Sequence, residues 1–298
     1  MRIIFCDNGF NPKEVDYMYA EEYSFAEQNS LSISLISFEE LKKGNIDMAL
    51  RRVKPSDEEE VGIYRGWMLK PSQYILLYEG LLKKKVELIN SLHEYIFCHY
   101  LPESYHVIKA FTPKTTFKKL DIPFDIRKFQ DELNSFGSSP IILKDYVKSQ
   151  KHYWDEACFI PDASDLEKVE SVIAKFLELQ GSDINEGLVF REFVELEKLT
   201  NHSKSGMPLT KEFRLFILYG KVIASFNYWD EGDYESVRPN IDFLKELIPA
   251  IDSNFFTVDI AKRKNGEWII IELGDGQVAG LPDNANKNTF YKTLKRGK

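Results

Sequence analysis

The feature that most constrains the fold of this 298-residue chain is the Asn265-Gly266 dipeptide between two apolar-rich runs. Asn-Gly in this setting is the strongest short signal for a β-hairpin, because a type I′ turn requires positive φ at both central residues. A two-residue loop fixes the register of the strands and places Asp259 directly opposite Glu272. The Cβ atoms of such cross-strand neighbours lie roughly 4.5–5.5 Å apart. We therefore expect two carboxylates side by side on one face of a sheet.

Opposed carboxylates need compensation, because like charges directly opposite each other destabilise a sheet. A divalent cation with oxygen ligands would supply it. The alternative is a solvated face on which the two side chains splay apart beside Lys262 and Arg263. We expect Trp268 and Ile270 on the face of Glu272, and this partly apolar setting favours a site. The opposite face is predicted to be core, with Val258, Ile260, Ile269, Ile271 and Leu273.

Composition and charge narrow the class of protein. A hydrophobic content of 43%, with 13% aromatic residues, supports a sizeable core. The net charge of −8 disfavours a nucleic-acid partner. The three cysteines have no CxxC spacing, so neither a disulfide framework nor a zinc site is indicated. No apolar run suggests a signal segment or a membrane partner, and we expect a cytoplasmic protein.

Two domains are expected from the pattern of elements. Residues 1–120 alternate strands and helices, which is typical of a small parallel α/β domain, and no GxGxxG follows the first strand. Residues 121–298 are predicted to be α+β and mostly antiparallel. Their expected elements are a strand at 140–144, an amphipathic helix at 165–180, a strand at 188–194, a hairpin at 213–227 over Tyr219-Gly220, a helix at 241–251 and the final hairpin.

Motifs in this second half carry a resemblance to a known family. In chain order they are a strand ending in Lys144, the run Arg191-Glu192-Phe193-Val194-Glu195, a hairpin with Arg214, and the pair Asp259 and Glu272. Over about residues 140–282 this set resembles the ATP-grasp superfamily. The first domain is similar to the α/β domain that usually precedes an ATP-grasp core. The resemblance thus implies an ATP-grasp fold with an N-terminal pre-ATP-grasp α/β domain, in a little-characterised branch of the superfamily.

The resemblance also implies a site for ATP and Mg²⁺. Lys144 would contact the phosphates, although a lysine at a strand end can also extend to solvent. The segment Glu192, Phe193 and Val194 would be the adenine hinge, with the Glu192 carbonyl accepting and the Val194 N–H donating. Either Glu195 or Glu197 would hold the ribose. Asp259 and Glu272 would bind Mg²⁺.

The sequence departs from the family pattern at two places. No glycine occurs from Asp145 to Pro161, so side chains, Lys148 above all, together with Ser149, Lys151 and His152, would replace backbone amides as the phosphate cradle. Gly274 stands where the family usually has a third metal ligand, an asparagine. Asp275 is the expected substitute, although Gly-Asp-Gly is also an ordinary turn.

Two arginines lie in apolar strand-like runs and therefore need an anion. Arg191 and Arg214 would hold the γ-phosphate and a substrate carboxylate or acyl phosphate. An internal salt bridge, for example with Glu192 or Glu212, is the alternative. In the first domain, Arg65 at a strand end is a candidate for binding the acid substrate.

These expectations lead to an ATP- and Mg²⁺-dependent carboxylate–amine (or thiol) ligase that acts through an acyl phosphate. Lys144, Arg191 and Arg214 would stabilise the transferred phosphoryl group, and no nucleophilic side chain is required. Its partners would be a small-molecule or peptide carboxylate and an amine. One alternative is a non-catalytic nucleotide-binding regulatory or interaction module, which the glycine-free loop favours. Another is an α+β scaffold that does not bind ATP.

Overall fold

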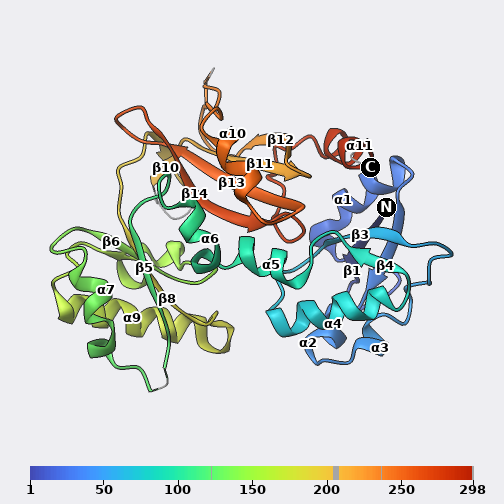
Figure 1. The fold of residues 1–298 in the computed structure, drawn as a ribbon, viewed down its shortest axis with the longest axis horizontal. Helices are drawn as coiled ribbons and strands as arrows, with labels where there is room; N and C mark the ends of the chain where they lie inside the picture. Colours follow the sequence, from blue (N-terminus) through green and yellow to red (C-terminus); the bar gives the residue numbers. More distant parts are fainter. Residues whose placement is uncertain (122, 204–207, 236, 297–298) are drawn as a thin grey trace.

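The computed structural model describes residues 1–121, 123–203, 208–235 and 237–296. Within these residues it contains three four-stranded sheets and a two-stranded hairpin. Figure 1 shows the N-terminal sheet on the right and the two other four-stranded sheets on the left and at the top. The architecture predicted from the sequence, an N-terminal parallel α/β unit followed by a mostly antiparallel α+β region, is confirmed. None of the described helices has both the length and the apolar character needed to cross a membrane.

The N-terminal sheet is parallel throughout and has the strand order β2-β1-β3-β4. Its strands are β1 Arg2–Cys6, β2 Ser32–Ile36, β3 Glu60–Arg65 and β4 Val86–Leu88. The helices of this region are η1 Tyr17–Tyr19, α1 Ala20–Gln28, α2 Phe38–Lys42, α3 Ile46–Ala49, α4 Pro71–Leu82, α5 Leu92–His99 and α6 Leu101–Ile108. Helix α5 ends at His99, and Pro102 lies in the first turn of the next helix, α6, where proline is tolerated because it needs no N–H donor.

The second sheet, β5-β8-β6-β7, is antiparallel and rests on a long helix. Its strands are β5 Thr115–Lys119, β6 Ile141–Asp145, β7 Phe159–Ile160 and β8 Gly187–Glu192. Helix α9, Leu166–Gln180, begins with Asp165 as N-cap and buries its apolar side against the sheet. The remaining helices are η2 Ile126–Phe129, α7 Gln130–Asn134, η3 Lys151–Tyr153, α8 Trp154–Ala157 and η4 Gly181–Asp183.

The third sheet, β12-β11-β13-β14, carries the predicted carboxylate pair. Its strands are β11 Glu212–Leu218, β12 Lys221–Asn227, β13 Phe255–Lys262 and β14 Trp268–Asp275, and the small hairpin is β9 Lys198–Asn201 with β10 Pro208–Thr210. Residues from α5, α6 and α10 (Leu244–Leu247, followed by η5 Ile248–Ala250) pack on one face of the sheet. The C-terminal α11, Lys287–Arg296, returns to pack against α1 and the first domain (Figure 1).

The two hairpins of the third sheet differ in their turns. The predicted hairpin over Tyr219-Gly220 is found, and both residues have positive φ, of 47° and 72°, which is type I′ geometry. The turn at Asn265-Gly266 is different: Arg263 pairs with Glu267, and only Gly266 has positive φ, at 92°. The loop therefore has three residues, with a glycine bulge, and the prediction of a two-residue loop was wrong.

A second irregularity restores the predicted pairing of the carboxylates. A β-bulge between Asp259 and Ile260 leaves Ile271 as the extra residue of β14, so Asp259 lies opposite Glu272 after all. The bulge also reverses the expected faces near the turn. Ile270 and Trp268 pack in the core, whereas Ile271 lies on the face of Glu272. The predicted core residues Val258, Ile260 and Leu273 are buried as expected.

The division of the chain at residue 120 remains a proposal. Strand β5 lies within the first expected domain, yet it pairs with β8 of the second sheet. This pairing would place the boundary before Thr115.

Arg65 joins the first domain to the segment that follows β14. It is 1% exposed, pairs with Glu22 at 2.9 Å, and donates to the carbonyls of Gly276, Gln277 and Ala279. All its hydrogen-bonding capacity is thus directed into the protein. The expectation that Arg65 binds the acid substrate was wrong, because burial of a guanidinium requires these fixed partners.

Asp275 occupies a second buried junction between the domains. Its carboxylate accepts hydrogen bonds from the Asn90 side chain at 2.6 Å and from the Gln277 backbone N–H at 2.9 Å. Burial, the largest cause, raises the pKa of Asp275 to about 7 despite these hydrogen bonds. The junction also contains Tyr74, which accepts from the Gln277 side chain.

Replacement of Arg65 by methionine is expected to destabilise the protein by roughly 3–5 kcal/mol, because it leaves the buried Glu22 carboxylate unpaired. Urea unfolding measures this free energy. Arg127→Met is the control, since Arg127 is exposed and its ion pair with Asp125 should contribute far less to stability than the buried pair. Equal losses for both variants would contradict the assigned role of Arg65.

Replacement of Asp275 by asparagine is expected to change the pH dependence of stability. The pKa of Asp275 is raised in the folded state, so the folded protein binds the extra proton. The stabilisation is fully present below pH 3.8, the ordinary pKa of an aspartate, and it is lost as the pH rises to about 7. Over this range the wild type should lose stability relative to Asp275→Asn. Urea unfolding at several pH values tests this, and a constant difference between the two proteins would contradict it.

Candidate active site

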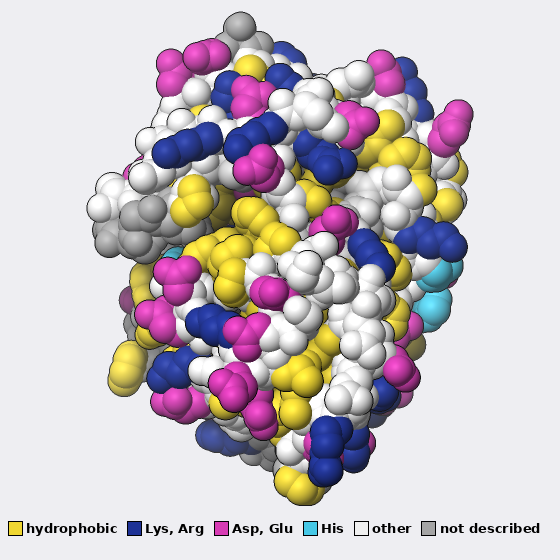
Figure 2. Space-filling model, turned by 90° about the vertical axis from the view of Figure 1, so that its left-hand side faces the viewer, with side chains coloured by type: hydrophobic (Ala, Val, Ile, Leu, Met, Phe, Trp, Pro, Cys, Tyr) yellow, Lys and Arg dark blue, Asp and Glu magenta, His cyan; other side chains and the backbone are white. Residues whose placement is uncertain are grey.

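A pocket of about 380 Å³ lies between the second and third sheets. This volume is within the range of small-molecule sites. Figure 2 shows a hollow with hydrophobic side chains on its walls on the side of the molecule that carries these sheets. The sequence-predicted residues that line the pocket are Lys144, Arg191, Glu192, Phe193, Val194, Glu195, Asp259 and Glu272. Lys144 and Glu272, which are 128 residues apart in sequence, thus meet in one cavity.

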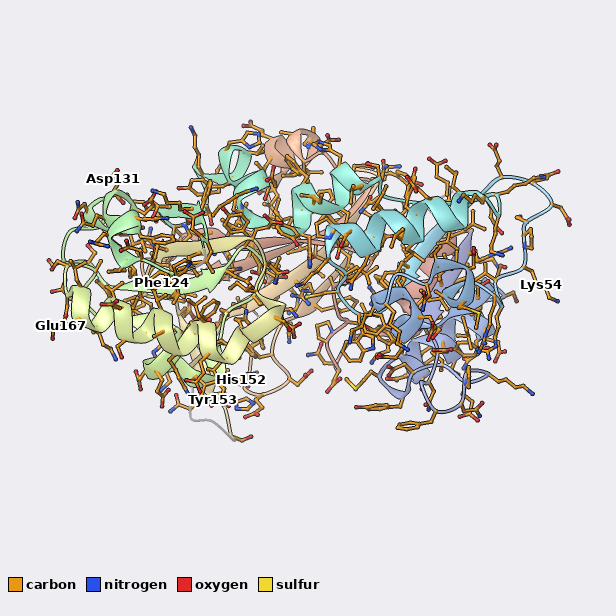
Figure 3. The ribbon with its side chains drawn as sticks, turned by 90° about the horizontal axis from the view of Figure 1, so that it is seen from below. Lys54, Phe124, Asp131, His152, Tyr153 and Glu167 are labelled. Atoms are coloured by element: carbon orange, nitrogen blue, oxygen red, sulfur yellow. The ribbon has the colours of Figure 1, made fainter. Side chains whose placement is uncertain are left out.

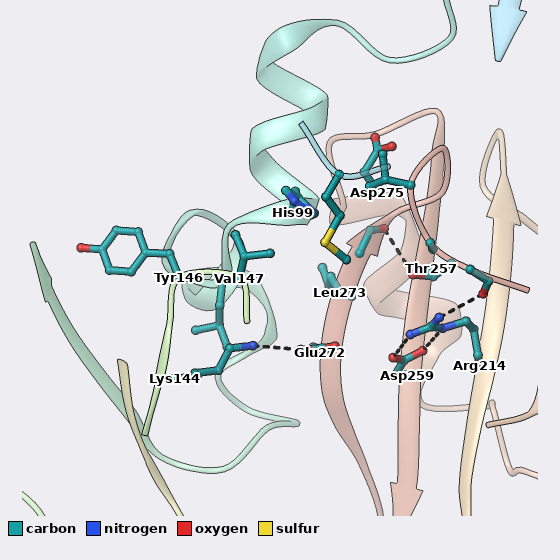
Figure 4. A pocket seen from close by; sticks show the side chains of 16 residues that line it. His99, Lys144, Tyr146, Val147, Arg214, Thr257, Asp259, Glu272, Leu273 and Asp275 are labelled. Atoms are coloured by element: carbon teal, nitrogen blue, oxygen red, sulfur yellow. Dashed lines mark hydrogen bonds and ion pairs between the residues drawn. The ribbon is translucent and has the colours of Figure 1, made fainter. Parts of the chain in front are cut away.

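Each carboxylate of the central pair is held by its own cation (Figure 4). Arg214, opposite Asp259 in the sheet, binds both carboxylate oxygens, at 2.8 and 2.7 Å. Lys144 reaches across from β6 and places its Nζ 2.9 Å from Glu272 Oε2. The alternative expected for Arg214, an internal salt bridge, is therefore what the structure shows, with Asp259 as the partner in place of Glu192 or Glu212. The two cations compensate the repulsion between the carboxylates.

The two carboxylates differ in their environments. Burial raises the pKa of Asp259, and the adjacent Arg214 opposes that shift. Burial acts on Glu272 in the same direction, but Lys144, Lys151 and Arg214 outweigh it and hold the pKa of Glu272 at about 2. The Glu272 side chain keeps 33% of its surface exposed to the pocket. Glu272 is therefore an accessible, ionised oxygen ligand at neutral pH.

Arg191 is fixed by the bulge in β14. Its guanidinium donates to the backbone carbonyls of Ile270 and Ile271 and to the hydroxyl of Thr112. Burial, the largest cause, lowers the pKa of Arg191 to about 10. Its buried Nε has no hydrogen-bond partner among the described residues, and none of their carboxylates pairs with its guanidinium. Arg191 thus ties the two sheets together through backbone carbonyls.

The predicted adenine hinge lies on the wall of the pocket where β8 ends. The N–H groups of Glu192 and Phe193 donate to the carbonyls of Lys114 and Pro140. Within the part of the chain that the structure describes, the N–H of Val194 has no hydrogen-bond partner. This free donor beside an apolar cavity is suited to a ring nitrogen of a bound base.

The two candidates for binding the ribose are placed differently. Glu195 lines the pocket, and its carboxylate pairs with Lys264 at 2.8 Å near the surface. Glu197 does not line the pocket, and its carboxylate pairs with Lys211 and Lys262 at 2.7 and 2.8 Å. Hydrogen bonds from these two lysines lower the pKa of Glu197. The geometry therefore favours Glu195.

The glycine-free loop directs a different lysine into the pocket from the one expected. Ser149 and Lys151 line the pocket, whereas Lys148 lines a separate cleft. The Lys151 ammonium lies over the rings of Tyr228 and Trp229, 5.3 and 4.7 Å from their centroids. His152 is exposed at the periphery of the molecule, as Figure 3 shows.

A magnesium ion fits the donor set at Asp259 and Glu272. Among the described residues, no group of three histidine, cysteine, aspartate or glutamate side chains is placed to hold a metal. Mg²⁺ needs only one or two carboxylates when substrate phosphates complete its coordination. Asp275 does not join the pair, since its carboxylate is bound to Asn90 and Gln277. At Gly274 a side chain is excluded, because a Cβ there would lie 2.7 Å from Thr257 Oγ1.

Sequence reasoning missed the aromatic residues of the site. Tyr228 lies between two cations, with Lys151 on its ring and the Arg214 guanidinium carbon 4.8 Å from its centroid. Tyr228 and Trp229 directly follow a predicted hairpin strand, and this position could have indicated that they line the site. No sequence signal indicated Thr112, whose role depends on the bulge.

Comparisons with known proteins agree with this geometry. A family model described as ATP-grasp domain, R2K clade family 3, matches residues 132–294. Among solved structures, D-cycloserine synthetase DcsG is similar with a TM-score of 0.59 at 12% identity, covering 100% of both chains. The D-alanine–D-alanine ligase of Bacillus anthracis complexed with ATP has a TM-score of 0.58 at 16% identity, covering 99% of this chain and 94% of its own.

A third similar structure is that of the ATP-grasp ligase PsnB complexed with the precursor peptide PsnA2 and AMPPNP. Its TM-score is 0.58 at 9% identity, with 100% of this chain and 97% of that chain covered. A search of curated proteins finds no match. The family match, which spans more than half of the chain, confirms the enzyme class expected from the sequence, an ATP-dependent ligase of the ATP-grasp type. The chain belongs to the ATP-grasp domain family of the R2K clade, family 3.

Proposed function

We propose that this protein joins a carboxylate to an amine (or thiol), with ATP and Mg²⁺, through an acyl-phosphate intermediate. The observation that carries the proposal is that Lys144 and the Asp259–Glu272 pair line the same pocket as the Glu192–Val194 segment, while Arg214 binds Asp259. A nucleotide needs this combination of a backbone edge for its base, cations for its phosphates and carboxylates for its metal.

ATP would lie along the pocket with its base against the hinge. The free N–H of Val194 would donate to the adenine ring, and the Glu192 carbonyl would accept from the adenine amino group. Glu195 would hold the ribose hydroxyls. Lys144 and Lys151 would contact the phosphates, with Ser149 as a further donor, because these side chains line the pocket in place of a glycine-rich loop.

Magnesium would bind Asp259 and Glu272 and supply charge neutralisation and alignment of the phosphates. Lys144 now neutralises Glu272, and Arg214 neutralises Asp259. With a metal ion bound at Glu272, that carboxylate would no longer need Lys144, and the Lys144 ammonium would be free to contact the phosphates. Arg214 would remain on Asp259 because both of its bonds to the carboxylate are short and buried.

The reaction would proceed in two displacements. A substrate carboxylate oxygen attacks the γ-phosphorus, the bond from the γ-phosphorus to the bridging oxygen breaks, and ADP leaves. The amine nitrogen then attacks the acyl carbon, inorganic phosphate leaves with the bonding electron pair, and the amine loses a proton. Lys144 would stabilise the charge on the phosphoryl oxygens by direct contact, and Arg214, which stays on Asp259, would contribute its positive charge from there. Arg191 was expected to bind the γ-phosphate or the substrate anion. It would instead hold Ile270 and Ile271 in place, because its NH groups already bind the bulge.

A non-catalytic nucleotide-binding module is the second candidate, and the absence of glycine between Asp145 and Pro161 favours it. The two candidates differ in turnover, because a module would bind Mg-ATP without releasing ADP when acids and amines are supplied. The carboxylate could be that of a small molecule or a peptide, and the similarity to a ligase complexed with a precursor peptide supports the latter.

Asp259→Asn and Glu272→Gln are expected to remove the magnesium-dependent part of nucleotide binding. At 100 times its Kd, Mg-ATP should stabilise the wild type by about 2.7 kcal/mol in thermal or urea unfolding. Both variants should lose most of this gain and all ADP release, whereas the gain from ATP with EDTA should be unchanged. Glu178→Gln, at an exposed pair with Lys175, is the control. Full retention of the magnesium-dependent gain in both site variants would contradict the proposal.

A further inference from the structure

A second cleft, of about 650 Å³, lies between the first domain and the loop after β6. Beside it is a small pocket lined by Lys144, Asp259 and Glu272. The two cavities share Met68, His99, Val147, Val278 and Gly280, so they lie next to each other. The cleft is therefore adjacent to the reactive end of the proposed nucleotide site, and its lining includes none of the hinge residues.

One wall of the cleft is apolar and open to solvent. Met18, Trp67 and Met68 line it and are 57%, 38% and 45% exposed. Trp67 is held in place by a hydrogen bond from its Nε1 to Asp16 at 3.0 Å and by an edge contact with Tyr19. Exposed large apolar side chains that gather in a concave surface mark a ligand site more often than isolated ones do.

The charged groups of the cleft leave one cation available. The Lys70 ammonium donates to the Ser182 carbonyl, and Lys287 pairs with Glu21 at 2.8 Å. Lys42 lies near Glu39 and over the ring of Phe38. Within the described part of the chain, the Lys148 ammonium has no hydrogen bond or ion pair.

The surroundings of Lys148 suit an anion. The exposed carboxylates Asp183 and Asp283 also line the cleft, but neither forms an ion pair with Lys148. His99 lines both cavities. Burial, the largest cause, lowers its pKa to about 3, although nearby Glu272 acts in the opposite direction, so His99 is neutral. Lys148 thus offers the unpaired positive charge beside an apolar wall.

We propose that this cleft binds the substrate that is not a nucleotide, and that it selects a molecule with a carboxylate paired to Lys148 and an apolar group packed on Trp67 and Met68. This inference rests on the proposed function, because it assigns a substrate class to the same reaction centre. It also moves Lys148 from the phosphate cradle to substrate recognition.

Calorimetric titration tests the inference on the full chain saturated with Mg²⁺ and AMPPNP. The probes are 3-phenylpropionate and L-phenylalanine, each compared with its amide, which lacks the negative charge. At least one acid should bind roughly tenfold or more tightly than its amide, the range expected for a hydrogen bond to a charged group. Lys148→Met should abolish this preference, and Lys70→Met, a change of the same charge in the same cleft, should preserve it. Met68→Ala should weaken binding of the acid and its amide alike.

The outcomes separate this inference from the proposed function. No binding of either acid, no preference for the acid over the amide, or equal effects of Lys148→Met and Lys70→Met would overturn the substrate assignment. The initial titration with Mg²⁺ and AMPPNP is an independent readout of the nucleotide site. If the nucleotide binds and the probes fail, only the cleft assignment is lost, whereas failure of the nucleotide to bind would reject the proposed function and this inference with it.

Discussion

The cross-strand pair of Asp259 and Glu272 is the constraint on which the rest of the site depends. Adjacent strands place the two carboxylates face to face, and the protein supplies a separate cation for each. Arg214 comes from the neighbouring strand of the same sheet, but Lys144 comes from the other sheet. The two ion pairs offset the repulsion between the carboxylates. The Lys144–Glu272 pair also joins the two sheets and holds them on either side of the pocket.

The bulge in β14 completes this arrangement. The extra residue, Ile271, breaks the ladder and turns carbonyls toward β8, where the Arg191 guanidinium binds those of Ile270 and Ile271. Two contacts between the sheets, Lys144–Glu272 and Arg191 with the bulge, therefore lie next to each other. Of these, only the lysine pair can open without leaving backbone carbonyls unsatisfied. This difference is why we assign phosphate binding to Lys144 and a structural role to Arg191.

How far the sequence could predict this structure depended on the range of the interactions. Local signals located most strands, the Asp165-capped helix and the Tyr219-Gly220 turn, because residue pattern and turn chemistry decide them. The pairing of Asp259 with Glu272 was predicted from a wrong loop length, and it holds because the three-residue turn and the bulge offset one another. Apart from Gly266 in the turn, the sequence carried no signal for the three-residue loop or for the bulge in β14.

The errors arose where distant segments meet. Arg65 was expected to face a substrate, but Glu22 and the backbone after β14 surround it, and no local pattern reports such partners. The choice between Lys148 and Lys151 likewise depends on how the loop after β6 turns toward Tyr228 and Trp229. Glycine at position 274 is explained by the Thr257 hydroxyl across the ladder, a contact visible only once the register is known.

A crystal structure with AMPPNP and Mg²⁺ tests the central claim most directly. We predict Mg²⁺ bound by oxygens of both Asp259 and Glu272 at about 2.0–2.1 Å, with the base at the Val194 N–H and the Lys144 ammonium moved from Glu272 to the phosphates. A nucleotide bound elsewhere, or one bound in this pocket while Lys144 still pairs with Glu272 and the metal contacts neither carboxylate, would contradict the account.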